Sequence, residues 1–140
     1  MAGSIVTTAI SGKSRGIVKF NCVITTHTDG TTPEVVIGSA FGRIVAIGYD
    51  ADNMDAGAVI TLKDKDSGAA LVTLTSAGTA DRLFRPTANV TANTGVAVTP
   101  ATTAVDVNRD IFVAGKLSLV VSAGGTSMGG KLQVVIQEGV

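Results

Sequence analysis

Few residues in this chain could do chemistry, and they are widely scattered. The sequence has one histidine, His27, and one cysteine, Cys22, together with one tyrosine and no tryptophan. A zinc site or a general base needs partner groups, and no second histidine is present. Cys22 falls on the apolar side of an alternating segment, which is typical of an inert core thiol. We therefore expect His27 in an exposed turn and Cys22 in the core.

Two glycine–lysine segments are similar to the start of a phosphate-binding loop. Residues 125–131 have the spacing G-x-x-x-x-G-K, but Leu132 follows where a hydroxyl residue is needed to bind Mg²⁺. A strand pattern also follows, in place of the helix whose N-terminus would hold the phosphate. In the segment 11–14 (SGKS), the required earlier glycine is replaced by Thr7. We therefore predict a hairpin loop at 125–131 and no nucleotide site.

Three aspartates, Asp50, Asp52 and Asp55, form the one candidate metal site. An EF-hand loop would require an oxygen ligand, a glycine and a glutamate at its fifth, sixth and twelfth positions. The chain has Met54, Asp55 and Thr61 at these positions. We expect a solvated turn, while calcium binding by loop carboxylates without that motif stays open. No catalytic residue, metal ligand or cofactor is predicted.

The charged residues do not favour a nucleic-acid partner. The chain has 11 basic and 11 acidic residues, whereas a nucleic-acid binder carries a basic excess on one face. Arginines and aspartates lie close together in two segments, 81–85 and 106–110. This mixture of charges favours ion pairs between strands or chains over phosphate binding. These residues are Asp81, Arg82, Arg85, Asp106, Arg109 and Asp110. Residues 89–91 form a glycosylation sequon, which has no consequence without a secretory signal.

The hydropathy of the chain raises the question of a membrane partner. Mean hydropathy is +0.42, and residues 86–105 carry no charge. That segment contains Pro86 and Pro100 and is rich in Thr, Ala and Asn, unlike a span of about 20 strongly apolar residues. The N-terminal segment lacks the basic and apolar regions of a signal peptide. We expect a soluble chain of intracellular origin with no membrane partner.

The low charge of the chain carries information about its surface. Only 16% of residues are charged, whereas an isolated small domain usually exposes about 25–35% charged residues. One interpretation is that partners cover part of the surface in the working state. The other is a surface of threonine and glycine that is polar without charge. Composition alone leaves both open.

Strand patterns recur along the whole chain, and no helical pattern is present. The clearest alternation places Val18, Phe20, Cys22 and Ile24 on one face of 17–26, and Leu132, Val134 and Ile136 on one face of 131–137. The strongest local signal is a hairpin at 58–75, where two β-rich runs flank DKDSG. Further strands are predicted at 4–10, 34–38, 43–50 and 111–122.

These strands predict an all-β fold, a jelly-roll-like antiparallel β-sandwich, in a single domain of residues 1–140. Residues 1–15 are predicted to form either an extended N-terminal arm or the first strand. A strand at 4–10 followed by the flexible 11–16 could leave the sandwich and add to a sheet edge of another protein.

With the chemical sites discounted, the whole chain resembles the small capsid cement or decoration proteins of tailed bacteriophages, in particular the jelly-roll type. The resemblance is strongest in NRDIFVAGKLSLVVSAGGTSMGGKLQVVIQ (108–137), and TTPEVVIGSAFGRIVAIG (31–48) adds to it. It implies a structural virion protein on the outer surface of an icosahedral head, made in the host bacterial cytoplasm. The implied partners are the major capsid protein and further copies of the chain, with a homodimer favoured over a homotrimer. No small-molecule substrate is implied.

Four apolar residues are our candidates for an interface: Ile5, Val6, Val120 and Val135. For Val120 and Val135, core positions in strands that are apolar on both faces are an equally good interpretation. Two other functions compete with the cement role. A carbohydrate- or receptor-binding module of a phage fibre or tail would need exposed aromatic rings, and the chain offers Tyr49 and four phenylalanines. A cupin-like enzyme would need several histidine ligands, so we expect no enzymatic activity.

Overall fold

The computed structural model describes residues 3–12, 16–75, 81–84, 86–89 and 108–138. These residues form strands and no helix, which confirms the predicted all-β class. The strands are β1 (Ser4–Gly12), β2 (Ile17–Thr25), β3 (Val35–Asp50), β4 (Val59–Asp64), β5 (Ala70–Leu74), β6 (Arg82–Phe84), β7 (Thr87–Asn89), β8 (Asn108–Asp110), β9 (Phe112–Ser122) and β10 (Gly129–Glu138). No helix long and apolar enough to cross a membrane lies in this part of the chain.

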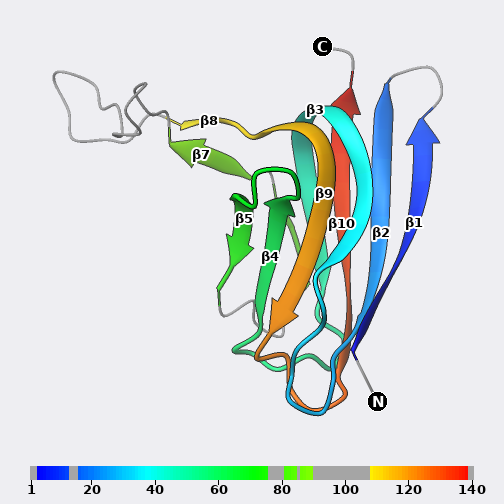
Figure 1. Cartoon of the computed structure of the whole chain (residues 1–140), viewed down its shortest axis with the longest axis vertical. Coiled ribbons are helices and arrows are strands. Elements are labelled where there is room, and N and C mark those ends of the chain that lie inside the picture. The colour runs from blue at the N-terminus through cyan, green and yellow to red at the C-terminus, as the bar shows by residue number, and fades with distance from the viewer. Residues whose placement is uncertain (1–2, 13–15, 76–80, 85, 90–107, 139–140) are drawn as a thin grey trace, which may run out of the picture.

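One antiparallel sheet folds over on itself to make two layers. Its order is β1-β2-β10-β3-β9-β4-β5, with β6 also paired to β3, and β7 pairs separately with β8. The first half of β3 pairs with β9 and the second half with β10. We call β1, β2, β10, β6 and the second half of β3 the back layer. The first half of β3 with β9, β4 and β5 is the front layer (Figure 1).

The shared strand β3 is what makes this arrangement a sandwich. A strand that passes from one layer to the other through a bend or bulge forms the corner between two sheets. The two layers approach closely, because a Cβ at Gly38 in the front layer would overlap the Phe20 ring in the back layer. The strand order does not by itself establish a jelly roll, which stays a prediction.

The prediction of two separate strands at 34–38 and 43–50 was wrong, because β3 is continuous across both. Its pairing register shifts at two points, between Val36 and Gly38 opposite β9 and between Ile44 and Ala46 opposite β10. Each shift inserts one residue, so the inward face changes from odd to even positions and back. The glycine-bearing segment SAFG (39–42), which was expected to separate two strands, therefore lies inside β3.

Elsewhere the predicted alternation is confirmed. The inward residues of β2 and β10 are all buried: Val18, Phe20, Cys22, Ile24, Leu132, Val134 and Ile136. They pack with inward residues of the front layer such as Leu117, Leu119 and Ile60. The hairpin at 58–75 is also confirmed, as β4 pairs with β5 through a turn at positive-φ Gly68. The core thus lies between the two layers, and function must be sought on their outer faces and edges.

Candidate interaction surface

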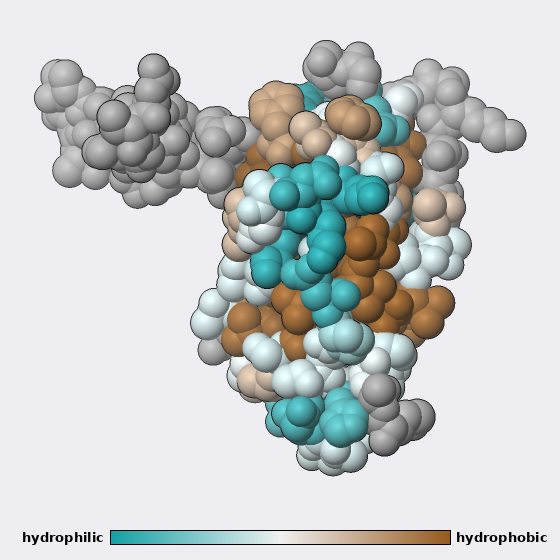
Figure 2. Space-filling model, in the orientation of Figure 1, coloured by the Kyte–Doolittle hydropathy of each residue, from teal (hydrophilic) through white to brown (hydrophobic). Residues whose placement is uncertain are grey.

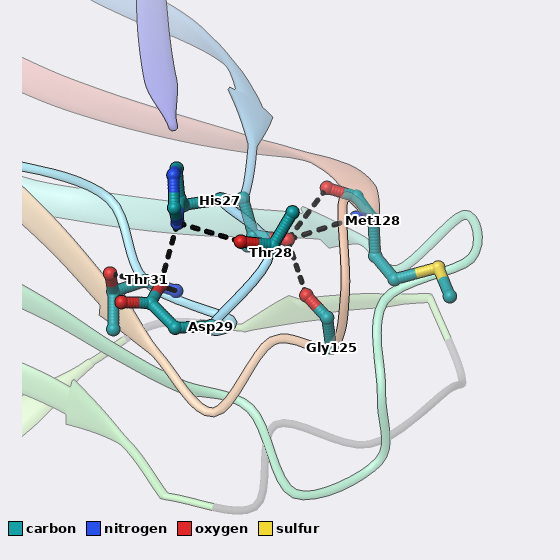
Figure 3. A network of polar contacts seen from close by, with 7 residues as sticks. His27, Thr28, Asp29, Thr31, Gly125 and Met128 are labelled. Carbon is teal, nitrogen blue, oxygen red and sulfur yellow. Dashed lines mark hydrogen bonds and ion pairs between the residues drawn. The ribbon is translucent and has the colours of Figure 1, made fainter. Parts of the chain in front are cut away.

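The single histidine belongs to a turn held by local hydrogen bonds. His27 Nδ1 lies 3.1 Å from the Thr28 hydroxyl and 3.4 Å from Asp29 Oδ1 (Figure 3). The same Asp29 oxygen accepts the Thr31 hydroxyl at 2.6 Å and the Thr31 N–H at 3.0 Å. These two bonds from Thr31 are the main reason that the pKa of Asp29 is lowered. The carboxylate therefore stabilises the turn, and His27 lies in the turn predicted for it.

The single cysteine lies in the core, as predicted. Cys22 is 1% exposed, and its Sγ lies 3.8 Å from the Thr7 hydroxyl of the neighbouring strand. Burial raises the pKa of the thiol, since a thiolate would lose its hydration there. A neutral, inaccessible thiol cannot act as a nucleophile.

The glycine-rich segment 123–128 is a loop, but it does not close a hairpin. It joins β9 to β10, which both pair with β3 and not with each other, so the predicted hairpin was wrong. Thr26 fastens this loop: its hydroxyl donates to the Gly125 carbonyl at 2.6 Å and accepts the Met128 N–H at 2.9 Å. Figure 3 shows Gly125 and Met128 beside the His27 turn. The loop therefore ties the two layers at one end of the sandwich.

The three aspartates of the candidate calcium loop are exposed and spread along a turn. The Asp50 carboxylate accepts the Asp52 N–H at 3.1 Å, and Asp52 adopts a positive φ of 45°. The Asp55 carboxylate instead lies next to Gly125 of the β9–β10 loop. Among the described residues, no group of three or more His, Cys, Asp or Glu side chains could hold a metal ion. The arrangement matches the predicted solvated turn.

Of the arginine and aspartate set, the structure describes only part. Asp81 Oδ1 accepts the Ala51 N–H at 3.3 Å, which ties the start of β6 to the end of β3. Arg85 and Asp106 lie outside the described residues, as do residues 90 and 91 of the sequon. The predicted ion pairs of this set stay a prediction.

A compact ion-pair cluster lies instead on the front layer. Glu34 contacts Lys63 at 3.1 Å and Lys65 at 2.7 Å. The hydrogen bond from Lys65, followed by that from Lys63, lowers the pKa of Glu34. Figure 2 shows a hydrophilic stripe along this layer beside an apolar area. The cluster fixes the start of β3 to β4 and to the turn that follows it.

We expect Glu34→Gln to weaken the acid dependence of stability. The pKa of Glu34 is lower in the folded chain than its ordinary value of 4.5, so the carboxylate stabilises the fold above that value. This contribution is lost as the pH falls through the lower folded pKa. We would measure urea unfolding at about pH 7 and about pH 2. The free energy of unfolding of the wild-type protein should exceed that of Glu34→Gln only at the higher pH. An equal difference at both pH values would contradict this explanation.

The four candidate interface residues lie on different surfaces. Ile5 is 7% exposed and packs in the core, so a partner could reach it only if β1 left the sheet. Val6 is 63% exposed on the outer face of the back layer. Val135 is partly buried on that same face, between Lys19 and Ala46 in register. Val120 is partly buried on the outer face of the front layer, opposite Thr61.

Two phenylalanines that the sequence analysis did not place on the surface are exposed. Phe41 is 66% exposed and Phe112 is 60% exposed. In the register of β3 with β9, Phe41 pairs with Ala114 and Phe112 with Arg43, so the two rings are diagonal neighbours on one face. They lie where β3 bends and β9 begins, toward the upper end of these strands in Figure 1. We call Phe41 and Phe112 the aromatic patch.

The local sequence explains why the aromatic patch was missed. Phe41 belongs to the SAFG segment, which was interpreted as a connection between strands. Phe112 directly precedes the inward Val113 and could be assigned to neither face before the register was known. Of the other aromatic residues, Phe20 and Tyr49 are buried and Phe84 packs against the core.

The outer face of the back layer is hollowed beside β6. An open hollow of about 340 Å³ is lined by Gly48, Tyr49, Asp50, Asp81, Arg82, Leu83, Lys131 and Gln133. Leu83 is 76% exposed at its rim, and Gly48 supplies no side chain to fill it. A second hollow of about 230 Å³ continues past Lys131 and Gln133 to Val23. Together they make an uneven surface across this layer, with Asp50, Asp81, Arg82 and Lys131 around the first hollow.

Comparison with known proteins does not assign the chain to a family. No protein-family model matches the chain, and no curated protein or solved structure is significantly similar to it. The functional argument therefore rests on the surfaces described above. These surfaces offer apolar contact area and open hollows with polar groups, whereas His27 is held in a turn and Cys22 lies in the core.

Proposed function

We propose that this protein is a non-enzymatic structural protein, a cement protein that binds the outside of an icosahedral phage head. The aromatic patch is the observation that carries this proposal. Two large rings more than half exposed on a small chain with 16% charged residues are typical of a surface that another protein covers. The partner is the major capsid protein, and the jelly-roll type of cement protein is the proposed relative.

A cement protein needs contact area with the capsid and carries out no reaction. A capsid presents many identical sites, so an oligomer that touches one subunit meets the next at a high effective concentration. Individually weak contacts then add up to stable binding and hold neighbouring capsid subunits together. A neutral chain suits this role, because copies that crowd on one shell do not repel through net charge.

The test is co-sedimentation of the purified protein with mature and immature heads of the source phage. We expect saturable binding at a fixed ratio, with preference for the expanded head. Phe41→Ser and Phe112→Ser should each weaken binding by about tenfold or more, because central aromatic residues dominate interface energies. Val36→Ser, which also shortens an exposed apolar side chain of the front layer, serves as the matched control.

Two outcomes would argue against the proposal. Failure of the wild-type protein to bind either form of head would contradict the cement role. Unchanged binding by both serine variants, with circular dichroism showing native folds, would remove the aromatic patch from the interface.

A second candidate function is binding of a carbohydrate or receptor, as in a phage fibre or tail module. The hollow beside β6 favours it, because Asp50, Asp81 and Lys131 bring polar groups around an open depression. The exposed rings of the aromatic patch, on the front layer, offer a separate surface against which a sugar can stack. Specific, saturable signals on a glycan array, together with no binding to heads, would favour this function over the first.

A further inference from the structure

Strand β1 forms an edge of the main sheet and has one paired side. It lies at the end of the strand order and pairs with β2 alone among the described strands. Figure 1 shows it as the outermost strand on its side of the sandwich. The pairing with β2 runs without a shift from Ser4 opposite Thr25 to Gly12 opposite Ile17. The strand is therefore an unbroken, nine-residue template whose second side carries backbone donors and acceptors.

This edge lacks the features by which proteins usually protect edge strands. Short length, bulges, prolines and charged side chains, lysine above all, discourage pairing with another chain. The sequence of β1, SIVTTAISG, has no charge and no proline, and its register has no bulge. By contrast, the opposite edge strand β5 has five residues, an irregular register and a charged turn before it. The edge strand β6 has three residues and begins with Arg82.

We propose that β1 pairs antiparallel with β1 of a second copy, about a two-fold axis at Thr8. Thr8 is the midpoint of the strand and is exposed on the outer face of the back layer. This register places Thr8 opposite Thr8 of the second copy and Val6 opposite Ile10 of the second copy. All of these residues are β-branched, which favours cross-strand pairing. No charged residue faces another anywhere along the strand pair.

The second copy fits this edge for two further reasons. About a two-fold axis, the free backbone groups of β1 in one copy form hydrogen bonds with those of β1 in the other. The pairing therefore closes as a dimer and leaves no new unpaired edge at β1. On the outer face, Val6 (63% exposed) stands opposite Val23 (47% exposed) of β2. In the dimer this apolar pair of each copy lies on one joined outer face, with the Thr8 pair between the two. The zero net charge of the chain removes long-range repulsion between copies.

In this dimer, β1 does not act as the extended arm that was considered from the sequence, which would leave the sandwich to join another sheet. β1 stays in its own sheet, with Ile5 in the core, and uses its free side. Deleting residues 2–10 would therefore remove part of the core and could not separate pairing from folding. Charge substitutions at the exposed Thr8 avoid this problem.

The test uses charges placed at the axis. Sedimentation equilibrium should show the wild-type protein at twice the 14.0 kDa chain mass. Thr8→Lys and Thr8→Glu should each dimerise about tenfold or more weakly, because like charges directly opposite each other destabilise a strand pair. An equal mixture of the two variants should dimerise again, because unlike charges then meet at the axis. Thr73→Lys, the same exchange at an exposed position of the edge strand β5, should leave the dimer intact.

Several results would overturn the proposal. They are a wild-type monomer or trimer, a dimer that persists in both Thr8 variants, and a mixture that fails to dimerise. A wild-type monomer whose binding to heads is lost in Thr8→Lys would assign the edge to the capsid protein instead. The pairing does not rest on the cement role, since mass is measured without heads, and failure to bind heads would leave it unaffected.

Discussion

Replacement of Gly42 by alanine is expected to lower the free energy of unfolding by about 3 kcal/mol, as for strong overpacking of a core. Gly42 lies where β3 passes between the layers, paired with Val113 of β9 on one side and Glu138 of β10 on the other. A Cβ there would overlap the Gln137 carbonyl oxygen and lie 2.9 Å from Glu138 Cα. These are backbone atoms, so no side-chain rotation relieves the overlap, and the strands must separate.

Urea unfolding monitored by circular dichroism measures this effect. Gly57→Ala is the matched control, because a Cβ at Gly57 meets no atom within 4 Å. That exchange should leave stability within about 0.5 kcal/mol of wild type or raise it slightly. Equal stability of the two variants would mean that the layers do not cross as described. A destabilised Gly42→Ala should also bind heads less well, since Phe41 of the aromatic patch is the adjacent residue.

Replacement of Thr26 by valine is expected to cost about 2 kcal/mol of stability. Thr26 is 2% exposed, and its hydroxyl bridges the Gly125 carbonyl and the Met128 N–H. Valine has nearly the same shape but neither donor nor acceptor, so both backbone groups lose a partner. The cost of such unpaired groups exceeds the net benefit of an ordinary hydrogen bond.

Thr26→Ser provides the control because it keeps the hydroxyl and removes one methyl group. It should cost less than about 1 kcal/mol in the same urea experiment. Amide hydrogen exchange should also become faster at Met128 in the valine variant and stay close to wild type in the serine variant. If the two variants lose equal stability, the methyl group and not the hydrogen bonds fastens the β9–β10 loop.

The sequence alone predicted the features that depend on local patterns. Alternation in 17–26 and 131–137 identified the buried faces of β2 and β10, since side chains of a strand point to opposite sides in turn. The hairpin of β4 and β5 followed from a charged, glycine-bearing turn between two β-rich runs. The scattering of titratable residues was also visible, since Cys22 and His27 were assigned to core and turn without any contact being known.

Features that depend on pairing between distant segments emerged only from the tertiary structure. Two inserted residues in β3 reverse its inward face twice, and such bulges are defined by the partner strands β9 and β10, not by β3 itself. The same pairing separates β9 from β10, exposes Phe41 and Phe112 on one face and leaves β1 at the edge. Alternation states that a residue faces one side of its strand. Whether that side meets the core, water or another chain depends on the layer and neighbours that the fold supplies.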